Sequence, residues 1–171
     1  MIETKRLLLR RTEMRDLDDF HAIFTHPKAM RYWSALPHES IQQTEEIVSA
    51  MVKVDHGFSD DFAVEYEGRV VGKAGCWRVG EIGFIFHPDV WGQGIATEAL
   101  AAAIPHAFET LPMEKIEADV DPRNASSLAV LRKFRFCEVG RAEKTFLLGD
   151  EWCDSIYLEL TRTGWLSRAK S

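Results

Sequence analysis

Apolar residues recur along the chain with two periods, and the order of these periods predicts its secondary structure. Alternation at every second residue indicates half-buried strands, while returns every three or four residues indicate amphipathic helices. Strands are predicted at residues 7–11, 62–66, 69–77, 81–87, 115–120, 136–142 and 152–160. Helices are predicted at residues 16–24, 42–54, 95–111 and 124–134. Since no repeat or linker separates these segments, residues 1–171 are predicted to form one α+β domain.

Two local features refine this pattern. Glu67 and Gly68 separate two strand segments and predict a hairpin, so the successive strands in this region are expected to pair antiparallel. Pro105 lies inside the longest helical segment, where it removes one backbone hydrogen bond and clashes with the preceding turn. We expect a kink at Pro105. The alternative is a helix that ends at Ala103, followed by a separate turn at residues 106–111.

The composition fits a protein with one substantial core. The chain has 171 residues, of which 46% are hydrophobic, and a single core is comfortable at about 100 to 200 residues. No apolar stretch approaches the roughly 20 residues of a membrane-spanning helix, so we expect a cytoplasmic protein without a membrane partner. Cys76, Cys137 and Cys153 lack the spacing of a metal site. They are predicted to be reduced and mostly buried, with no metal bound.

The net charge narrows the choice of partners. The formal charge of -6 at pH 7 argues against nucleic acid, because phosphate binding normally requires a basic surface. An acidic protein attracts a cationic small molecule or a basic peptide instead, although the same charge also serves solubility alone.

The segment from Glu81 to Ala99 carries the strongest functional signal. A short apolar strand leads through a proline turn to Gly92 and Gly94 and directly into a helix. Glycine permits positive φ and close approach of a ligand, and the first N–H groups of the helix point back at the loop. This arrangement predicts a site for phosphate or pyrophosphate. The P-loop sequence GxxxxGK(S/T) is absent, and Thr97 replaces the third glycine of a dinucleotide fingerprint.

This segment resembles the acetyl-CoA signature Q/R-x-x-G-x-G/A of the GNAT N-acetyltransferase superfamily. Gly94 and Ala96 occupy its last two defined positions, and Trp91 stands in place of Gln or Arg. The form WGxGxATEA is similar to that of the ribosomal-protein N-terminal acetyltransferases and their relatives. Softer similarities, LxLRxxxxxDxxx near the N-terminus and GxxWxD at residues 149–154, extend the resemblance over most of the chain.

Residues 121–136 resemble the next motif of the superfamily, NxxSxxxLxKxGF. The matching positions are Asn124, Ser127, Leu131, Lys133 and Phe136. Asn124 and Ser127 lie about one turn apart and so present polar groups on the same side of a helix. Each also has a structural alternative, because Asn is a preferred N-cap and serine is common in a first helical turn.

The chain departs from this motif at two positions. Arg135 replaces the usual glycine, which removes the easiest left-handed helix stop and predicts a different cap. Leu131 stands where many members carry a tyrosine that protonates the leaving thiolate. In the branch that this chain resembles, the serine matching Ser127 is assigned that role.

The resemblance implies a fold and a co-substrate. The fold is a mixed, mostly antiparallel sheet of six to seven strands, with helices on both faces and a splay between the fourth and fifth strands. A bulge in the fourth strand would let the backbone of residues 84–87 pair with the pantetheine arm of acetyl-CoA. The implied cofactor-binding residues are Phe84, Ile85, Phe86, His87, Trp91, Gly92, Gln93, Gly94, Ile95, Ala96, Thr97, Asn124 and Ser127.

The implied reaction is direct attack of an amine on the thioester, without an acyl-enzyme, and it needs a proton acceptor and a proton donor. Ser127 is the predicted donor. The candidate acid-base residues near the carbonyl are Glu81, His87, Asp119, Asp121 and Asp154. Glu81 and Asp154 are favoured as the base, although any one of the five is more often a solvated or structural charge. Trp33 either borders the acceptor or packs as an ordinary aromatic residue.

The sequence therefore predicts an acetyl-CoA-dependent N-acetyltransferase, either monomer or homodimer, whose acceptor is a primary amine of a small molecule or of a protein N-terminus. One alternative is a catalytically silent acyl-CoA-binding regulatory module of the same fold, which a test of thioester turnover would distinguish. Another is a nucleotide-binding oxidoreductase, which NAD binding without CoA binding would favour. The fold does not choose the acceptor.

Overall fold

The computed structural model describes residues 1–55 and 57–168, so His56, to which no role is assigned, and residues 169–171 lie outside the description. The strands form one eight-stranded sheet in the order β1-β2-β3-β4-β5-β6-β8-β7. They are β1 (Ile2–Glu3), β2 (Leu7–Arg10), β3 (Asp60–Tyr66), β4 (Arg69–Arg78), β5 (Glu81–Phe86), β6 (Lys115–Val120), β7 (Cys137–Leu148) and β8 (Glu151–Thr161). Neighbouring strands pair antiparallel except for β5 and β6, which are parallel.

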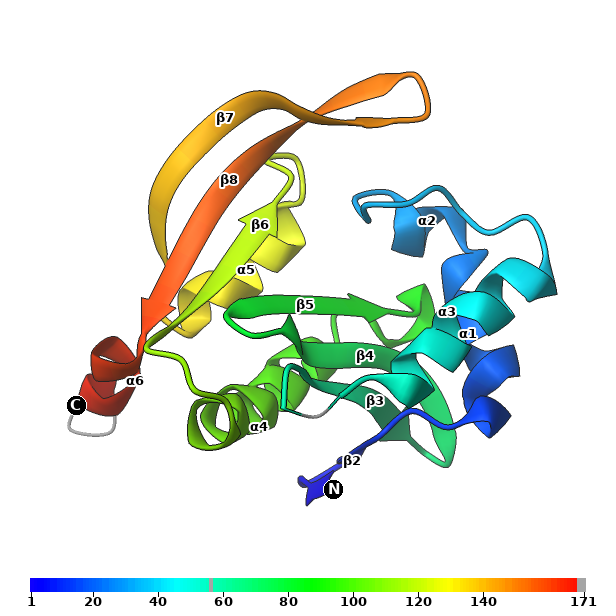
Figure 1. Cartoon of the computed structure of the whole chain (residues 1–171), viewed down its shortest axis with the longest axis horizontal. Helices are drawn as coiled ribbons and strands as arrows, with labels where there is room; N and C mark the ends of the chain where they lie inside the picture. Colours follow the sequence, from blue (N-terminus) through cyan, green and yellow to red (C-terminus); the bar gives the residue numbers. More distant parts are fainter. Residues whose placement is uncertain (56, 169–171) are drawn as a thin grey trace.

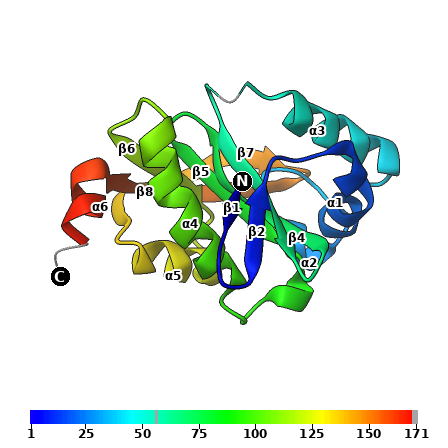
Figure 2. The ribbon, with the colours of Figure 1, turned by 90° about the horizontal axis from the view of Figure 1, so that it is seen from below.

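Helices cover both faces of the sheet, as the family resemblance implies. They are α1 (Leu17–Phe24), α2 (Pro27–Met30), α3 (Ile41–Lys53), α4 (Ile95–Thr110), α5 (Ala125–Lys133) and α6 (Arg162–Arg168), with short 3-10 helices η1 (Met14–Asp16) and η2 (Pro88–Val90). Figure 2 shows α4 lying across the sheet beside β1 and β2, with α1 and α3 on the right.

Successive side chains of the strands point to opposite faces of the sheet and belong to two separate hydrophobic cores. Along β3, Phe62 and Val64 belong to the larger core, which includes the buried face of α4, whereas Ala63 belongs to the smaller core with α1 and α3. This is the period-two alternation expected of a strand that is covered on both faces. The two cores hold the central strands at a fixed position between the helical layers.

β5 and β6 meet over a short length and then diverge. The ladder between them has one register pair, Glu81 with Glu117, beside a 2.7 Å hydrogen bond from the Glu117 N–H to the Gly80 carbonyl. Figure 1 shows β6, β8 and β7 rising away from β3, β4 and β5. The splay predicted between the fourth and fifth predicted strands, which are β5 and β6, is confirmed.

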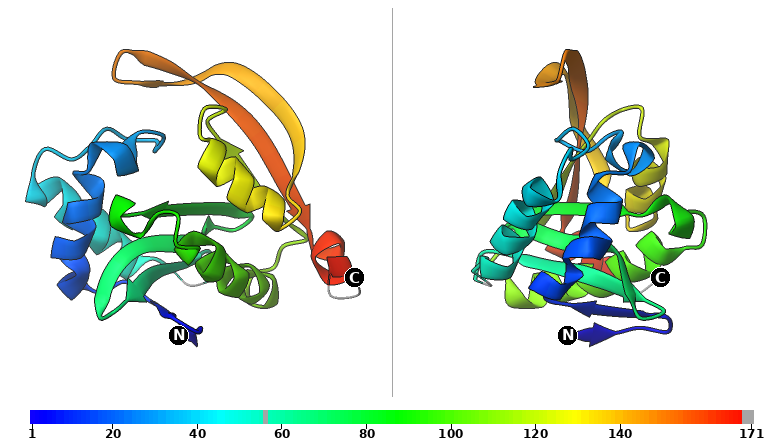
Figure 3. Two further views of the ribbon diagram at one scale, coloured as in Figure 1. Left: turned by 180° about the vertical axis from the view of Figure 1, so that it is seen from behind. Right: turned by 90° about the vertical axis from the view of Figure 1, so that its right-hand side faces the viewer.

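Some elements differ in extent from the sequence pattern. The elements β1, α2 and α6 were not predicted, because each is too short or too irregular to show a period, and β1 raises the strand number to eight. β7 continues to Leu148 instead of ending at residue 142, because an irregularity between Ala142 and Phe146 shifts its pairing with β8 without ending it. Figure 3 shows the long curved hairpin that results.

The structure tests the predicted helix ends at Pro105 and at Arg135. α4 runs through Pro105 to Thr110, so the alternative of an end at Ala103 is wrong. Arg135 adopts the left-handed conformation itself, with φ 66°. The N–H groups of Arg135 and the next residue donate to carbonyls of the last turn at 2.9 and 3.2 Å, which is the ordinary glycine-type helix stop. The prediction of a different cap at Arg135 is therefore wrong.

The β-bulge expected in the fourth predicted strand, β5, lies instead in its neighbour β4. β5 pairs with β4 in regular register from Gly83 to Phe86, and the irregularity lies between Cys76 and Arg78 of β4. The extra residue there is Trp77, whose indole N–H donates to the Glu81 carboxylate at 3.2 Å.

The three cysteines are free, with Cys76 and Cys153 buried and Cys137 exposed. The expectation of reduced, mostly buried cysteines holds for two of them, while Cys137 is at the start of β7 on the sheet edge. Across the described part of the chain, the helices are too short or too polar to cross a membrane.

Candidate active site

The turn between β5 and α4 is built around two glycines in the left-handed conformation. The φ angle is 72° at Gly92 and 77° at Gly94, a region that costs other residues about 1 kcal/mol or more. Trp91 fixes the start of the turn because its indole N–H donates to the Phe86 carbonyl at 2.9 Å. The Gln93 side chain donates to another backbone carbonyl of the turn at 2.8 Å. The loop is thus held by bonds to its own backbone.

The N-terminus of α4 opens onto this turn. Gly94 is the N-cap and offers no side-chain oxygen, and the first bond within the helix joins the Glu98 N–H to the Gly94 carbonyl at 2.9 Å. The N–H groups of residues 95–97 precede that bond and have no acceptor in a preceding turn. They provide the donors and the positive helix end that an anion prefers.

Glu98 joins this helix start to the N-terminal strands. Its carboxylate accepts hydrogen bonds from Thr4 at 2.6 Å and from the Arg6 Nε at 2.7 Å. Burial alone would raise the pKa of Glu98, but the bonds from Thr4 and Arg6 outweigh it and hold the pKa below its usual value. Arg6 also donates to the Gln93 carbonyl at 3.0 Å, so the ion pair supports the glycine turn directly.

A cavity of about 670 Å³ lies against this turn, β5 and α5, hereafter the glycine-turn cavity. The predicted cofactor-binding residues that line it are Phe84, Ile85, Phe86, Trp91, Gly92, Gly94, Ile95, Ala96, Thr97, Asn124 and Ser127. Lys28, Arg31 and Lys133 also line it and supply positive charge. Lys28 and Arg31 lie outside both motifs, so no local pattern indicates that they belong to this site.

His87 and Gln93 do not join the other predicted residues. They line a different cavity of about 590 Å³, together with Asp19 and Arg69. The His87 N–H already donates to the Val71 carbonyl at 2.8 Å, and its ring packs edge-on against another histidine ring. The backbone N–H of residue 87 is bonded to β4 and the Gln93 side chain is bonded within the turn, so the structure does not bring these two side chains to the glycine-turn cavity. Their part in cofactor binding stays a prediction.

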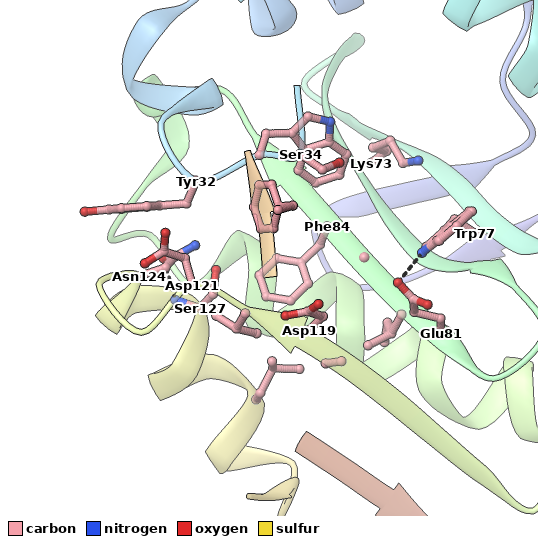
Figure 4. Close-up of a pocket in the computed structure, with 17 residues that line it drawn as sticks. Tyr32, Ser34, Lys73, Trp77, Glu81, Phe84, Asp119, Asp121, Asn124 and Ser127 are labelled. Atoms are coloured by element: carbon pink, nitrogen blue, oxygen red, sulfur yellow. Dashed lines mark hydrogen bonds between the residues drawn. The ribbon is translucent and has the colours of Figure 1, made fainter. Parts of the chain in front are cut away.

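A second cavity, of about 390 Å³, lies where β5 and β6 diverge, hereafter the acidic cavity. Its carboxylates are Glu81, Asp119 and Asp121, and Figure 4 shows them with the aromatic residues around them. Its aromatic lining comes from Tyr32, Trp33, Trp77, Phe84 and Phe146. The residues that line both cavities are Tyr32, Trp33, Phe84, Asn124 and Ser127.

Ser127 lies at the junction of the two cavities. Asn124 caps α5 by accepting a hydrogen bond from the Ser127 N–H at 3.2 Å and one from the Ser126 hydroxyl at 3.0 Å. Both proposed properties of Asn124 therefore coexist, since it is the N-cap and it also lines the cavities. Within the described residues, no hydrogen-bond partner is found for the Ser127 hydroxyl. Leu131, one turn further on, is fully buried and offers no polar group.

Comparison with known proteins identifies the family. Residues 6–137 match the family described as the acetyltransferase (GNAT) domain. The chain is a GNAT acetyltransferase. The prediction of an acetyl-CoA-dependent N-acetyltransferase is confirmed, with acetyl-CoA as co-substrate.

Curated relatives extend the match over nearly the whole chain. The uncharacterized N-acetyltransferase YnaD of Bacillus subtilis is 28% identical over 172 residues, covering 96% of this chain and 98% of its own. The spermidine N(1)-acetyltransferase of Escherichia coli is 26% identical over 173 residues, covering 95% of this chain and 90% of its own.

Solved structures have the same fold. A GNAT-family acetyltransferase from Bacillus anthracis is 25% identical, with a TM-score of 0.80 over 94% of this chain and 97% of its own. Spermidine N-acetyltransferase from Vibrio cholerae, solved with CoA and spermine, is 22% identical, with a TM-score of 0.82 over 95% and 99% of the two chains. RimL, a ribosomal L7/L12 acetyltransferase solved with CoA, is 17% identical, with a TM-score of 0.83 over 94% and 97%.

Two of the three carboxylates in the acidic cavity of this GNAT acetyltransferase have cationic partners. Glu81 accepts hydrogen bonds from the Trp77 indole N–H at 3.2 Å and from Arg78 at 2.9 Å. Asp121 accepts from Arg123 at 2.9 Å, a hydrogen bond that holds the pKa of Asp121 below its usual value. Among residues 1–55 and 57–168, no cation forms an ion pair with Asp119.

Asp154 is not brought to either cavity. It lies on β8, where its carboxylate accepts a hydrogen bond from the Lys144 N–H at 2.8 Å. Lys144 has a positive φ of 51° within the irregular stretch of β7. This carboxylate therefore supports the shape of the hairpin, and the structure separates it from Ser127 and Glu81, with which it was grouped as catalytic.

The acidic cavity also contains a basic residue that the sequence did not single out. The Lys73 ammonium lies 2.5 Å from a carboxylate oxygen of Asp61 and 5.9 Å from the centre of the Trp33 ring. Trp33 therefore lines the cavities and packs as an aromatic wall at the same time. Lys73 is on β4 and faces the site only because β4 and β5 are paired, which is information that a local motif does not contain.

Proposed function

We propose that this GNAT acetyltransferase transfers the acetyl group of acetyl-CoA directly to a primary amine, carried by a small cationic molecule or by a protein N-terminus. The observation that carries the proposal is the junction of the two cavities at Ser127. One cavity offers donors and cations suited to CoA phosphates, and the other offers carboxylates suited to an ammonium. A reaction of an amine with a thioester requires both reactants at one point.

The glycine-turn cavity is the proposed site for CoA. The N–H groups at the start of α4 would bind the pyrophosphate, while Lys28, Arg31 and Lys133 would balance its phosphate charges. Residues 84–86 line the same cavity between the turn and Ser127. The pantetheine arm would follow them, which brings the thioester to the junction.

Ser127 is the proposed proton donor to the departing thiolate. Its hydroxyl is not engaged by any other described side chain or backbone group, so it can turn toward a sulphur atom at the junction. Leu131 cannot serve, because it has no ionisable group. Positioned acids typically accelerate such steps by about a hundredfold to ten-thousandfold.

The acceptor class is supported by the charge of the acidic cavity. It contains three carboxylates and one lysine, and that lysine is already balanced by Asp61. Aromatic faces beside carboxylates favour a cation. Relatives act on amines of two kinds, since their names specify spermidine and the ribosomal protein L7/L12. Both kinds of acceptor therefore belong in the test.

The proposal is tested by thiol release from acetyl-CoA with a panel of acceptors: polyamines, amino acid amides and short peptides with free N-termini. At least one primary amine should accelerate release and become acetylated. If CoA binds tightly but no amine accelerates release, the proposal fails in favour of a silent acyl-CoA-binding module.

Replacing Ser127 with alanine should lower kcat by about a hundredfold or more and leave CoA affinity nearly unchanged, because the hydroxyl acts on the leaving group. Single-turnover rates and calorimetry with CoA measure the two effects. Ser49→Ala is the matched control, since Ser49 lies on α3 and lines neither cavity. A kcat for Ser127→Ala within about threefold of the parent would assign Ser127 a structural role.

A further inference from the structure

The carboxylates of the acidic cavity are not equivalent. Glu81 is paired with Arg78 and bonded to Trp77, and Asp121 is paired with Arg123. Among the described residues, no Lys, Arg or His forms an ion pair with Asp119. The Asp119 side chain is exposed and lines the cavity, so a cation entering from solvent can reach it. Asp119 therefore holds a negative charge that the free protein leaves unbalanced.

Asp119 is exposed and faces the acidic cavity. It is on β6, with its side chain toward the cavity, and in the view of Figure 4 it lies between Ser127 and Glu81, beside Phe84. Burial by the surrounding strands raises its pKa, the Glu81 charge raises it further, and the Ser155 hydroxyl partly opposes both.

The described groups around Asp119 come from three other strands and from the end of β6, and they do not include an uncompensated cation. They are Glu81 on β5, Ser155 and Tyr157 on β8, Lys73 on β4, and Asp121 directly after β6. The lysine is neutralised by Asp61 at 2.5 Å. An ammonium entering the cavity would supply the partner that Asp119 lacks.

We propose that Asp119 receives the ammonium of the acceptor and takes the proton that must leave before the amine attacks. This inference rests on the proposed acetyl transfer and names its base. Glu81 is a weaker candidate, since its oxygens already accept hydrogen bonds from Arg78 and Trp77. Its role is to add negative charge beside Asp119 and so to make Asp119 a stronger proton acceptor.

The proton balance is complete with Asp119 and Ser127. Asp119 takes one proton from the ammonium and later releases it to solvent. The neutral nitrogen then forms a bond to the carbonyl carbon, and the bond from that carbon to sulphur breaks. Ser127 gives its proton to the departing sulphur. The nitrogen must lose a second proton to become an amide, and Ser127 recovers that proton.

The test is the pH dependence of kcat for Asp119→Asn, which keeps the size of the side chain. With the best amine of the panel, kcat of the parent should rise with pH and level off above the pKa of Asp119. At neutral pH the variant should be slower by about a hundredfold or more, and log kcat should continue to rise with pH because hydroxide must replace the base. Glu117→Gln on the same strand, which lines neither cavity, should match the parent.

A second readout separates a base from a structural residue. A raised pKa means that ionised Asp119 disfavours the folded state at pH values above the unfolded pKa of about 3.9. Asp119→Asn should therefore have a melting temperature at neutral pH equal to or above that of the parent, despite its lower kcat. A merely structural carboxylate would give a lower melting temperature.

Three outcomes would overturn the inference. One is a variant with kcat and pH profile within about threefold of the parent. Another is a raised KM with unchanged kcat, which would make Asp119 a binding charge only. A third is a larger loss of kcat in Glu81→Gln than in Asp119→Asn, which would make Glu81 the base. If the parent releases no thiol with any amine, the proposed function fails first and the inference fails with it.

Discussion

The two cavities that meet at Ser127 are built in opposite ways. The glycine-turn cavity is built around residues 81–99, in which strand β5, two left-handed glycines and the start of α4 follow one another, and side chains from the α2 region and α5 complete it. The acidic cavity is formed by side chains from β4, β5, β6, β7, α5 and the segment after α2. One is organised by a single continuous segment, whereas the other has no such central segment and exists only once distant strands have folded together.

This difference predicts which half of the site tolerates changes in sequence. Backbone N–H groups bind a phosphate regardless of most side chains, so the cofactor half tolerates sequence change as long as its glycines remain. Charge in the acidic cavity depends on single substitutions such as Lys73 or Asp119. We therefore expect the choice of acceptor to depend on the side chains of the acidic cavity more than on the glycine turn.

The largest effect is expected from a substitution in the glycine turn, the proposed site for CoA. Gly94→Asp should place a carboxylate beside the helix start and force an unfavourable φ of 77° on a side chain. Losing two hydrogen bonds to a charged group costs about 3 kcal/mol, so CoA affinity should fall on the order of 100-fold or more. Calorimetry with CoA measures this loss.

The control for Gly94→Asp is Gly68→Asp. Gly68 has nearly the same φ, 79°, but lies in the hairpin turn between β3 and β4 with nothing within 4 Å of an added Cβ. It should share the loss of stability and retain CoA affinity. Unchanged CoA affinity in folded Gly94→Asp would remove the turn from the cofactor site.

The same contrast determines how much could be predicted from the sequence. The elements around Gly94 and Asn124 follow from local rules for turns and caps, and the structure contains them at the predicted positions. Asp119 and Glu117, by contrast, lie on the same strand and no local pattern distinguishes them. Glu117 still pairs with β5, whereas Asp119 lies beyond the point where β5 and β6 separate. Arg135 shows that even a local rule can be met by an unexpected residue, because it adopts the left-handed conformation and its N–H bonds back to the last helical turn as a glycine would.

Asp154 illustrates the limit most clearly. An acidic residue among apolar strand positions is expected to have a partner, and it does have one in the Lys144 N–H. The sequence could not place that partner, because the irregular pairing of β7 with β8 was itself not predicted.

A smaller effect is expected from the charged contacts that hold the acidic cavity together. Glu151 on β8 bonds to Arg31 at 3.2 Å and to Arg123, and both guanidinium groups lie over the ring of Tyr32 at 5.4 and 5.7 Å. Glu151→Gln should loosen these segments and raise the KM of the acceptor by about two- to fivefold, as expected for exposed ion pairs. The KM for acetyl-CoA should change less.

Glu138→Gln is the matched control, because Glu138 pairs with Arg141 on the same hairpin and lines neither cavity. Added salt should reduce the difference between Glu151→Gln and the parent by screening the pairs. Equal changes in both KM values would mean that the hairpin does not distinguish the two halves of the site.

The smallest effect concerns pH and the segment that carries Tyr32 and Trp33. The Thr44 hydroxyl contacts the Nδ1 atoms of His21 and His38, each at 2.8 Å, and so joins α1, α3 and the segment before α3. Burial lowers the pKa of His38, and the neighbouring His21 lowers it further. The unfolded state therefore binds more protons below about pH 6.5, and the free energy of unfolding should decrease as the pH falls from 7.5 to 5.5.

His38→Asn keeps a polar atom near the Nδ1 position and removes the titration, so its free energy of unfolding should depend less on pH over this range. Urea unfolding at both pH values measures the difference. Hydrogen exchange should increase at residues 31–40 of the parent at pH 5.5, while the hydrogen-bonded amides of residues 98–104 in α4 change less, because the contacts of Thr44 with the two histidines join α1 and α3 and not α4. If exchange rises equally in both segments, the two halves of the site share one unfolding unit. If His38→Asn follows the pH dependence of the parent, His38 is not the group that titrates.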